Sequence, residues 1–409
     1  MGLLSHMDKE VLEVVLKKLA KESSIASITE IEAVPALPKG ENYSSNILRL
    51  TLKVVLGNGR MAKKSLIMKQ IITGGDRGEL LKHLNVAKEE SKIYSVIHKE
   101  MSYLMEEFED TDEPLWCNFI HYDPDLCCIL LEDLKSTGYS LVPRQKGMDF
   151  HHAVLALRGL GRYHGMAKVL EERGFVSKHD YIPYGFFTNL KIVKAVPYAG
   201  ILNTAKAIRE SWGSHWKETA RKLMISFDPF AAKHMQSVQV EKSEFTCLNH
   251  GDCWSNNMMF KYDFQKRPIA VKFLDYQMPH HNTPCVDVTN FFYLSIQPGV
   301  RRSNYALLVK AYHDSLSSSL EKFGFTGTKP TLEEITATMK RLEFFGLTIF
   351  VSVYPAVVCS SVEAFDFEKL LKTDGQEGFN PDVLTEPGLI EKMGPDIIDF
   401  TERHTHDLY

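Results

Sequence analysis

The residues best suited to chemistry lie in one short stretch, residues 250–257, which reads His-Gly-Asp-Cys-Trp-Ser-Asn-Asn. It places an acid, Asp252, five positions before an amide, Asn257, and a second acid, Asp275, follows a predicted short strand. A carboxylate can take the proton of a hydroxyl group, and amide and carboxylate oxygens suit Mg²⁺ as ligands. We therefore expect phosphoryl transfer from a nucleotide triphosphate, with Asp252 as the base and with Asn257 and Asp275 as magnesium ligands.

Each of these residues also has an ordinary structural explanation. Asp252 and Asn257 could cap a turn. Asp275 could end a strand, and His250 could pack in the core. We favour the catalytic interpretation because the preceding part of the chain supplies a lysine and a glutamate in the order that such chemistry needs. His250 is then expected to organise the loop, and Cys253 to be a packed thiol, because no cationic neighbour in the sequence would lower its pKa.

The lysine is Lys69, a charged residue in the otherwise apolar run from Leu66 to Ile72. A helix is expected from about Glu79 to Lys99, and it carries Glu89 and Glu90, either of which could pair with the lysine. Such a pair would hold the lysine against the α- and β-phosphates of a nucleotide. The alternative is a solvent-facing strand lysine and two surface acids.

Two further segments could contact a nucleotide. The sequence contains no Gly-x-x-x-x-Gly-Lys-Ser/Thr loop, so a P-loop enzyme is not expected. The candidate for a loop over phosphates is residues 38–45, Pro-Lys-Gly-Glu-Asn-Tyr-Ser-Ser, whose small residues leave backbone N–H groups accessible. Later, Glu132-Asp133-Leu134 leads into the linker-like run from Lys135 to Gly138, whose backbone would face an adenine ring.

Hydrophobic periodicity predicts the elements that position these residues. Four apolar residues spaced as on one helix face predict an N-terminal amphipathic helix. They are Leu12, Val15, Leu16 and Leu19. Two β-hairpins are expected over residues 48–72 and 116–131, the first with a Gly57-Asn58-Gly59 turn.

From Leu141 onward helical patterns dominate the sequence. The expected helices cover residues 149–173, 205–227, 301–323, 331–356 and 382–402. The exception is a short strand over residues 269–274, directly before Asp275. A chain of 409 residues exceeds the size at which one core keeps growing, so two lobes are expected.

Composition excludes several classes of function. Apolar residues make up 44% and charged residues 24% of the chain, as in ordinary globular proteins, and a net charge of −4 argues against nucleic acid as a partner. Seven cysteines without disulfide or metal-ligand spacing, and no secretory leader, favour the cytoplasm. The longest apolar run, Phe344 to Cys359, is too short to span a bilayer and predicts a buried helix. His280-His281 is expected to be a polar loop rather than a metal site.

The order of the motifs resembles the ecdysteroid kinase-like family, within the aminoglycoside phosphotransferase and choline kinase superfamily. The family pattern His-Gly-Asp-x-Trp-x-x-Asn is matched in full at residues 250–257, and its Asp-Phe/Tyr-Gln element at residues 275–277. The first-lobe motifs correspond to Gly40, Asn42, Tyr43 and Ser45 in the loop, Lys69 in the strand, Glu90 and Tyr94 in the helix, and Leu131, Glu132, Asp133 and Leu134 in the hinge. The match spans roughly residues 30 to 300, and residues beyond about 300 carry no motif of the family.

The resemblance implies an α+β, bilobal, protein-kinase-like fold. Its small antiparallel-sheet N-lobe with helices would cover residues 1–134, and its larger, mainly helical C-lobe residues 135–409. ATP and Mg²⁺ are the implied cofactors. Ser44 would bind the nucleotide together with the other loop residues and the hinge residues. The resemblance also selects Glu90 over Glu89 as the partner of Lys69, and it gives Asp287 a structural role behind the catalytic loop.

The implied activity is ATP-dependent phosphorylation of a hydroxyl on a small, apolar molecule such as a steroid or a xenobiotic alcohol. Aromatic residues of the second lobe could line the acceptor pocket or form core. They are Phe186, Phe187, Phe291, Phe292, Tyr293 and Tyr354. The alternatives are a choline or ethanolamine kinase, from which the sequence departs at Gly251 and Trp254, a relative that binds small molecules without catalysis, and a protein kinase, whose HRD, DFG and APE triplets are absent from the sequence. The oligomeric state stays open.

Overall fold

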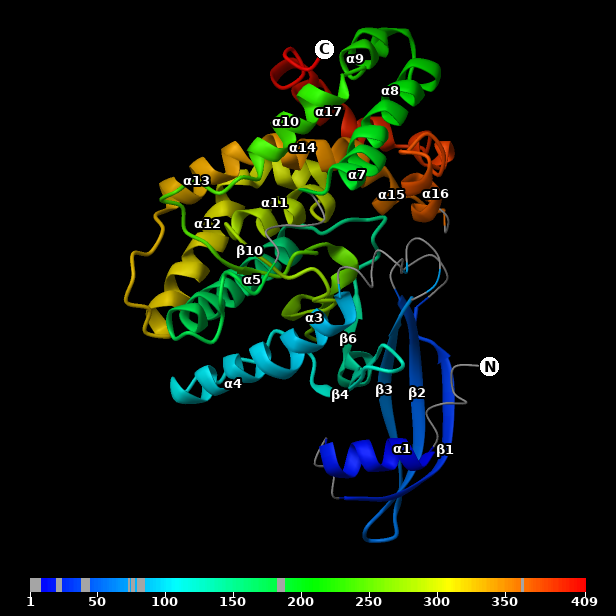
Figure 1. The fold of residues 1–409 in the computed structure, drawn as a ribbon, viewed down its shortest axis with the longest axis vertical. Coiled ribbons are helices and arrows are strands. Elements are labelled where there is room, and N and C mark those ends of the chain that lie inside the picture. The colour runs from blue at the N-terminus through cyan, green and yellow to red at the C-terminus, as the bar shows by residue number, and fades with distance from the viewer. Residues whose placement is uncertain are drawn as a thin grey trace. The chain divides into compact units, whose positions relative to one another are not determined.

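The computed structural model divides the chain into two compact units, and it has the α+β character that the sequence predicts (Figure 1). The structure describes residues 9–19, 24–37, 45–72, 74, 78, 85–181, 188–361 and 364–409. The first unit comprises residues 1–98 and 116–140, and it holds a five-stranded antiparallel sheet. The second unit comprises residues 99–115 and 141–409 and is mainly helical.

The sheet of the first unit has the strand order β1-β2-β3-β5-β4, and all neighbouring pairs are antiparallel. The strands are β1 (Ile25–Pro35), β2 (Ser45–Leu56), β3 (Met61–Ile71), β4 (Phe119–Asp123) and β5 (Cys128–Glu132). Both predicted hairpins are confirmed, as β2-β3 and β4-β5. Strand β1 was missed, because two register shifts, at Ile25/Ser27 and Ile28/Glu30, break the alternation of apolar and polar residues by which a strand is recognised.

Helical segments pack against and follow this sheet. Helix α1 (Lys9–Val14) continues as a π-helical turn, Val15–Leu19, and Leu12, Val15 and Leu16 are buried with sheet residues in one apolar cluster. The predicted amphipathic helix is therefore confirmed. The helix expected at 79–99 is described from α3 (Val86–Lys92), through a π turn at Ile93–Ile97, to α4 (His98–Glu107), so it ends eight residues later than expected.

Residues 99–115, which the predicted division at 134 assigned to the first lobe, cluster with the second unit. The segment makes ion pairs with the second unit through the buried Asp110. Its carboxylate contacts Arg162 and Lys322, each at 2.7 Å. The backbone N–H of Phe273 also donates to the Leu115 carbonyl at 2.7 Å. These contacts tie the segment to helices and a strand of the second unit.

The second unit contains most of the helices. Its longer ones are α5 (Phe150–Glu172), α8 (Ala199–Ser211), α10 (Phe227–Ser237), α11 (Cys285–Leu294), α12 (Pro298–Lys322), α13 (Leu332–Arg341), α14 (Glu343–Ser352) and α17 (Leu389–Arg403). Its shorter ones are α7 (Leu190–Val193), α9 (Lys217–Lys222), α15 (Tyr354–Val358) and α16 (Phe367–Lys372). Short strands interrupt them, namely β7 (Cys247–Asn249), β8 (Met258–Tyr262), β9 (Pro268–Phe273) and β10 (His280–Asn282).

Two of the predicted helices are divided in the structure. The segment 205–227 is divided at Gly213, whose φ of +101° does not fit a helix. The segment 331–356 forms three helices, α13, α14 and α15, which meet at Leu342 and Val353. Helix α14 is buried, as predicted. In the part of the chain that the structure describes, none of the helices combines the length and the apolar character needed to cross a bilayer.

Helices α5 and α12 approach each other closely because α5 has glycine at two positions one turn apart. A Cβ at Gly161 would lie 2.7 Å from the Tyr312 carbonyl oxygen, and a Cβ at Gly165 would lie 2.7 Å from the Cβ of Ser319. Any side chain at these positions would push the helices apart. This contact fixes the position of α5, and with it the side chain of His164, against α12.

Candidate active site

The three residues predicted to do the chemistry meet at one end of the β8-β9 hairpin. Asn257 directly precedes β8, and the carbonyl of Asn257 accepts a hydrogen bond from the backbone N–H of Leu274 at 2.9 Å. Leu274 is the residue before Asp275. On the other side, the side-chain amide of Asn257 donates to Asp252, to Oδ2 at 2.8 Å and to the carbonyl oxygen at 2.9 Å. The hairpin therefore brings Asp252, Asn257 and Asp275 together.

His250 stabilises this arrangement. It is 1% exposed, its Nε2 lies 2.9 Å from the Leu274 carbonyl, and its Nδ1 accepts a hydrogen bond from the backbone N–H of Asp252 at 3.2 Å. Because Nδ1 is an acceptor, Nε2 carries the proton and donates to Leu274. Burial lowers the pKa of His250, which keeps the ring uncharged in this role. The prediction that His250 organises the loop is confirmed.

Gly251 is required by the shape of the loop. Its φ is +90°, and a Cβ at this position would lie 1.8 Å from the Met278 carbonyl oxygen. No residue with a side chain fits without moving one of the two backbones. The glycine between His250 and Asp252 thus lets the loop that carries the acid pass directly over the segment after Asp275.

A buried acid, Asp287 of α11, anchors the loop. Its carboxylate accepts hydrogen bonds from the backbone N–H groups of His250 at 2.6 Å and Gly251 at 2.9 Å, and it contacts Nε2 of His164 at 3.1 Å. Burial alone would raise the pKa of Asp287, but the hydrogen bond from His164 and the nearby histidines lower it to about 2. The structural role expected for Asp287 matches these contacts.

Asp275 has a left-handed backbone, with φ of +64°. For a residue other than glycine this conformation costs about 1–2 kcal/mol. Both polar backbone groups of Leu274 are engaged, the N–H by Asn257 and the carbonyl by His250, and Tyr276 is fully buried with its ring centroid 4.3 Å from that of His250. The neighbours on both sides are thus fixed, and the strained conformation of the acid is maintained by them.

The donor chemistry of this cluster fits a magnesium ion. The nitrogen of the Asn257 amide is engaged with Asp252, so the carbonyl oxygen at the other end of the same amide is the atom that could reach a cation. With the Asp275 carboxylate it supplies hard oxygen donors, which Mg²⁺ prefers, together with phosphate oxygens and water. Asn257 and Asp275 would therefore hold the metal.

In the first unit, Lys69 of β3 and Glu90 of α3 form a buried ion pair. The distance from Nζ to Oε2 is 2.6 Å, and the two side chains are 4% and 0% exposed. A solvent-facing lysine is therefore wrong, and Glu90 rather than Glu89 is the partner. Burial of a charged lysine costs free energy, so lysines are almost never fully buried unless they are paired. Its action on phosphates stays a prediction.

The acidic side chains of the hinge, Glu132 and Asp133, make contacts within the first unit. The Asp133 carboxylate accepts from Nε of Arg49 at 2.7 Å and from the Ser65 hydroxyl at 2.6 Å, and it caps a 3₁₀ turn that begins at Leu134. Burial would raise the pKa of Asp133, but its partners, Arg49 first among them, lower it. The Glu132 carboxylate accepts from the backbone N–H of Asn118 at 3.0 Å, and Leu134 is buried. Nucleotide contacts by the backbone of this segment stay a prediction.

The predicted phosphate loop lies mostly outside the described residues. This applies to Gly40, Asn42, Tyr43 and Ser44. Ser45 is described, as the first residue of β2, where it is buried opposite Ile71. Nucleotide contacts by this loop stay a prediction.

Other predictions about reactive and aromatic residues have clear outcomes. Cys253 is fully buried, and burial raises its thiol pKa well above the ordinary value, so it is a packed thiol as expected. The aromatic residues of α11 and Tyr354 are buried and form core, while Phe186 and Phe187 lie outside the described residues. The polar loop expected at His280-His281 is wrong: both residues belong to β10, which pairs with β7.

Sequence reasoning missed two residues behind the loop, His164 of α5 and Tyr312 of α12. Both are fully buried. The signal that could have found them is the pair Gly161 and Gly165, whose spacing marks the tight helix contact on which both side chains lie. Nothing in the sequence near Tyr312 indicates its partner.

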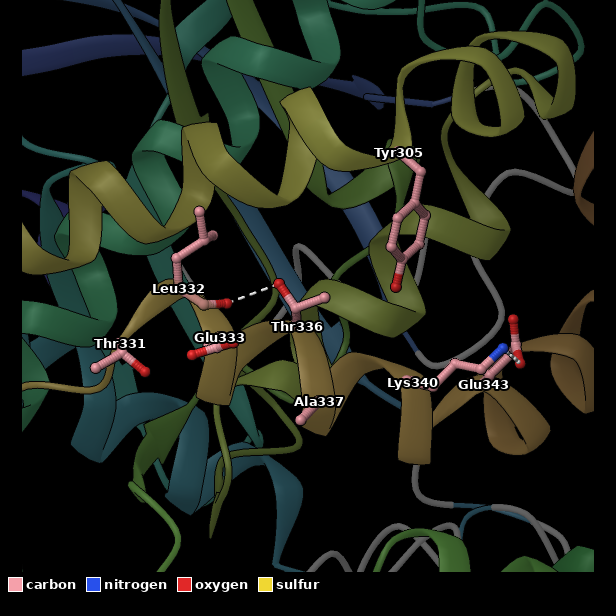
Figure 2. Close-up of a pocket in the computed structure, with 8 residues that line it drawn as sticks. All are labelled: Tyr305, Thr331, Leu332, Glu333, Thr336, Ala337, Lys340 and Glu343. Atoms are coloured by element: carbon pink, nitrogen blue, oxygen red, sulfur yellow. Dashed lines mark hydrogen bonds and ion pairs between the residues drawn. The ribbon is translucent and has the colours of Figure 1, made fainter.

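A surface hollow elsewhere in the second unit contains none of the predicted site residues (Figure 2). It has a volume of about 1010 Å³ and lies where α12, α13 and α14 meet. Tyr305 of α12 points its hydroxyl into it, and Lys340 and Glu343 form an ion pair at its rim, at 2.8 Å.

Comparison with known proteins supports the sequence resemblance. A search of curated proteins gave no match. The model of the ecdysteroid kinase-like family matches residues 39–325, which include the Lys69–Glu90 pair, the hinge, and the Asp252, Asn257 and Asp275 cluster. This is a family of kinase-like phosphotransferases, and the match supports an enzyme. With more than half of its length covered by one family model, the chain belongs to the ecdysteroid kinase-like family.

Proposed function

We propose that the protein transfers the γ-phosphoryl group of ATP, with Mg²⁺, to a hydroxyl group of a small apolar molecule. The observation that carries this proposal is the cluster at the end of the β8-β9 hairpin, where Asn257 bridges Asp252 and the strand end that leads to Asp275. It joins a candidate base and candidate metal ligands through one residue, whose side chain contacts Asp252 and whose backbone contacts Leu274. Phosphoryl transfer needs this combination and little covalent help from the protein.

The proposed roles follow from the chemistry of each side chain. Asp252 accepts the proton of the acceptor hydroxyl, and its hydrogen bond from Asn257 favours the ionised carboxylate and fixes its direction. Asn257 and Asp275 hold Mg²⁺, which neutralises charge on the phosphates when bound. Lys69, held by Glu90, contacts the α- and β-phosphates, and the backbone of residues 132–134 and the loop at residues 40–45 complete nucleotide binding.

The acceptor that we propose is an alcohol of the steroid or xenobiotic type. The family in which the chain belongs takes its name from ecdysteroid phosphorylation. We also propose that the protein is cytoplasmic. Its N-terminal lobe would bind the nucleotide and its C-terminal lobe the acceptor. The net charge of −4 gives no reason to expect a nucleic acid among the partners.

A screen of candidate acceptors tests the proposal. The purified full chain is incubated with ATP and Mg²⁺ and with a panel of ecdysteroids, sterols, phenolic glycosides and choline. ADP release and the mass gain of one phosphate on the acceptor are measured together, with and without EDTA. We expect an EDTA-sensitive mass gain on an apolar alcohol. Phosphorylation of choline alone would contradict the acceptor class, and binding of panel members without any ADP release would contradict the reaction.

A further inference from the structure

A chain of buried hydrogen bonds runs from helix α12 to the loop that carries Asp252. The Tyr312 hydroxyl lies 3.1 Å from Nδ1 of His164, and Nε2 of His164 lies 3.1 Å from Asp287. Asp287 in turn accepts the backbone N–H groups of His250 and Gly251. Tyr312 and His164 are 0% exposed and Asp287 is 1% exposed, so water does not replace any of these partners.

The donor and the acceptor of each hydrogen bond can be assigned from the two ends of this network, Asp287 and Tyr312. Asp287 has its pKa lowered to about 2, so its carboxylate is ionised and accepts only, and Nε2 of His164 must carry the proton that faces it. Burial raises the pKa of Tyr312 well above its ordinary value, so the hydroxyl keeps its proton. With the proton on Nε2, Nδ1 is the acceptor of the Tyr312 hydroxyl, and this second hydrogen bond fixes the orientation of the ring.

We propose that Tyr312 is a positioning residue for the catalytic loop. Its hydroxyl fixes the orientation of the His164 ring, His164 then orients the Asp287 carboxylate, and Asp287 holds residues 250 and 251 so that Asp252 keeps its direction. The close contact of α5 and α12 at Gly161 supports this role, because it seats the backbone of Tyr312 directly against the helix that carries His164.

The first test reads the hydrogen bond at Nδ1 of His164 and does not depend on activity. The full chain is labelled with ¹⁵N-histidine, and the two ring nitrogen signals of His164 are assigned by their loss in a His164→Gln variant. We expect a protonated Nε2 and an unprotonated Nδ1 in the wild type and in Tyr312→Phe, and in the variant a shift of the Nδ1 signal, because Nδ1 has lost the hydroxyl that donates to it. Tyr305→Phe is the matched control, since it removes a hydroxyl from the same helix at the surface hollow, and it should leave the signals unchanged. An unaltered Nδ1 signal in Tyr312→Phe would overturn the proposal.

The second test is kinetic and rests on the proposed function. Tyr312→Phe should lower kcat about tenfold and leave KM for ATP within about twofold, because orientation of the loop is lost and nucleotide contacts are not. His164→Gln keeps an N–H that can face Asp287, and in that background Tyr312→Phe should have no further effect, since its hydroxyl acts only through the ring. If the kcat losses of the two single variants multiply in the double variant, Tyr312 acts independently of His164. That result would overturn the proposal. If no acceptor is phosphorylated at all, the proposed function fails while the ¹⁵N measurement still decides whether Tyr312 holds His164.

Discussion

The side-chain amide of Asn257 donates a hydrogen bond to the carboxylate of Asp252, with 2.8 Å between Nδ2 and Oδ2. This contact links the candidate base to a candidate metal ligand, because the same amide has its carbonyl oxygen at the opposite end. In the proposed reaction one planar group would set both the direction of the base and the position of the metal. The backbone of Asn257 adds a second link, to the residue before Asp275.

Replacing Asn257 by Asp separates these two functions. The variant keeps an oxygen ligand for Mg²⁺ but exchanges the hydrogen-bond donor for a second negative charge beside Asp252. A like charge raises the pKa of a carboxylate, so the acidic limb of the pH dependence of kcat should move to higher pH by about one unit or more. The measurement is the pH–rate profile of the variant against the wild type. An unshifted acidic limb would show that the Asn257 contact does not tune the base.

Loss of the buried Lys69–Glu90 pair should cost both stability and turnover. Lys69→Met removes the cation beside a fully buried carboxylate, and we expect the free energy of unfolding to fall by about 3 kcal/mol. Adding Glu90→Gln should restore most of that stability but no turnover, because the lysine is still missing. Urea denaturation and ATP turnover are measured for both. The control is Lys53→Met on the same sheet, whose ion pair with Glu30 is exposed and whose loss should change little. Equal stability losses at positions 69 and 53 would contradict the importance of burial here.

Gly251→Ala should disrupt the loop more than its backbone angle alone explains. The added Cβ would meet the Met278 carbonyl oxygen at 1.8 Å, and we expect a loss of about 3 kcal/mol or more in stability, with turnover abolished. Gly174→Ala isolates the backbone effect, since φ is +81° there and the space is open. It should cost about 1 kcal/mol and leave turnover unchanged. Similar losses in the two variants would rule out the close approach as the cause.

Burial of His280 makes stability depend on pH. Burial lowers its pKa from 6.5 to about 4, although Asp287 nearby opposes this effect, so the unfolded chain binds a proton in a range where the folded one does not. Stability that is present above pH 6.5 is therefore lost as the pH falls toward 4, by about 3 kcal/mol. His280→Gln should flatten the fall in the urea midpoint between about pH 7 and pH 4.5. His179→Gln, at an exposed histidine, is the control and should leave the fall in the urea midpoint unchanged.

The sequence predicted an element correctly where a single physical rule determined that element. Alternation with a Gly57-Asn58-Gly59 turn predicted the β2-β3 hairpin, and helical periodicity over residues 149–173 predicted α5 to within one residue at each end. Strand β1 was missed because its register shifts disturb the alternation. The helix expected at 331–356 was wrong in extent because apolar residues continue across its breaks, and periodicity does not register a change of helix direction.

The candidate site was predictable as a set of residue types and not as a network. The spacing of Asp252 and Asn257 indicated their chemistry, and the family resemblance indicated Glu90. The contacts that hold them depend on residues far away in the chain. His164, Asp287 and Tyr312 meet only because α5 and α12 pack closely, and a long-range hydrogen bond has no signature in a single sequence.

The most direct measurement of the central claim is the turnover of Asp252→Asn with ATP, Mg²⁺ and an acceptor that the wild type phosphorylates. Asparagine has nearly the same shape and cannot take the proton of the acceptor hydroxyl. We predict that kcat falls on the order of 10²–10⁴-fold while the affinity for magnesium-bound ATP stays within about threefold. Near-full turnover in this variant would contradict the assignment of Asp252 as the base.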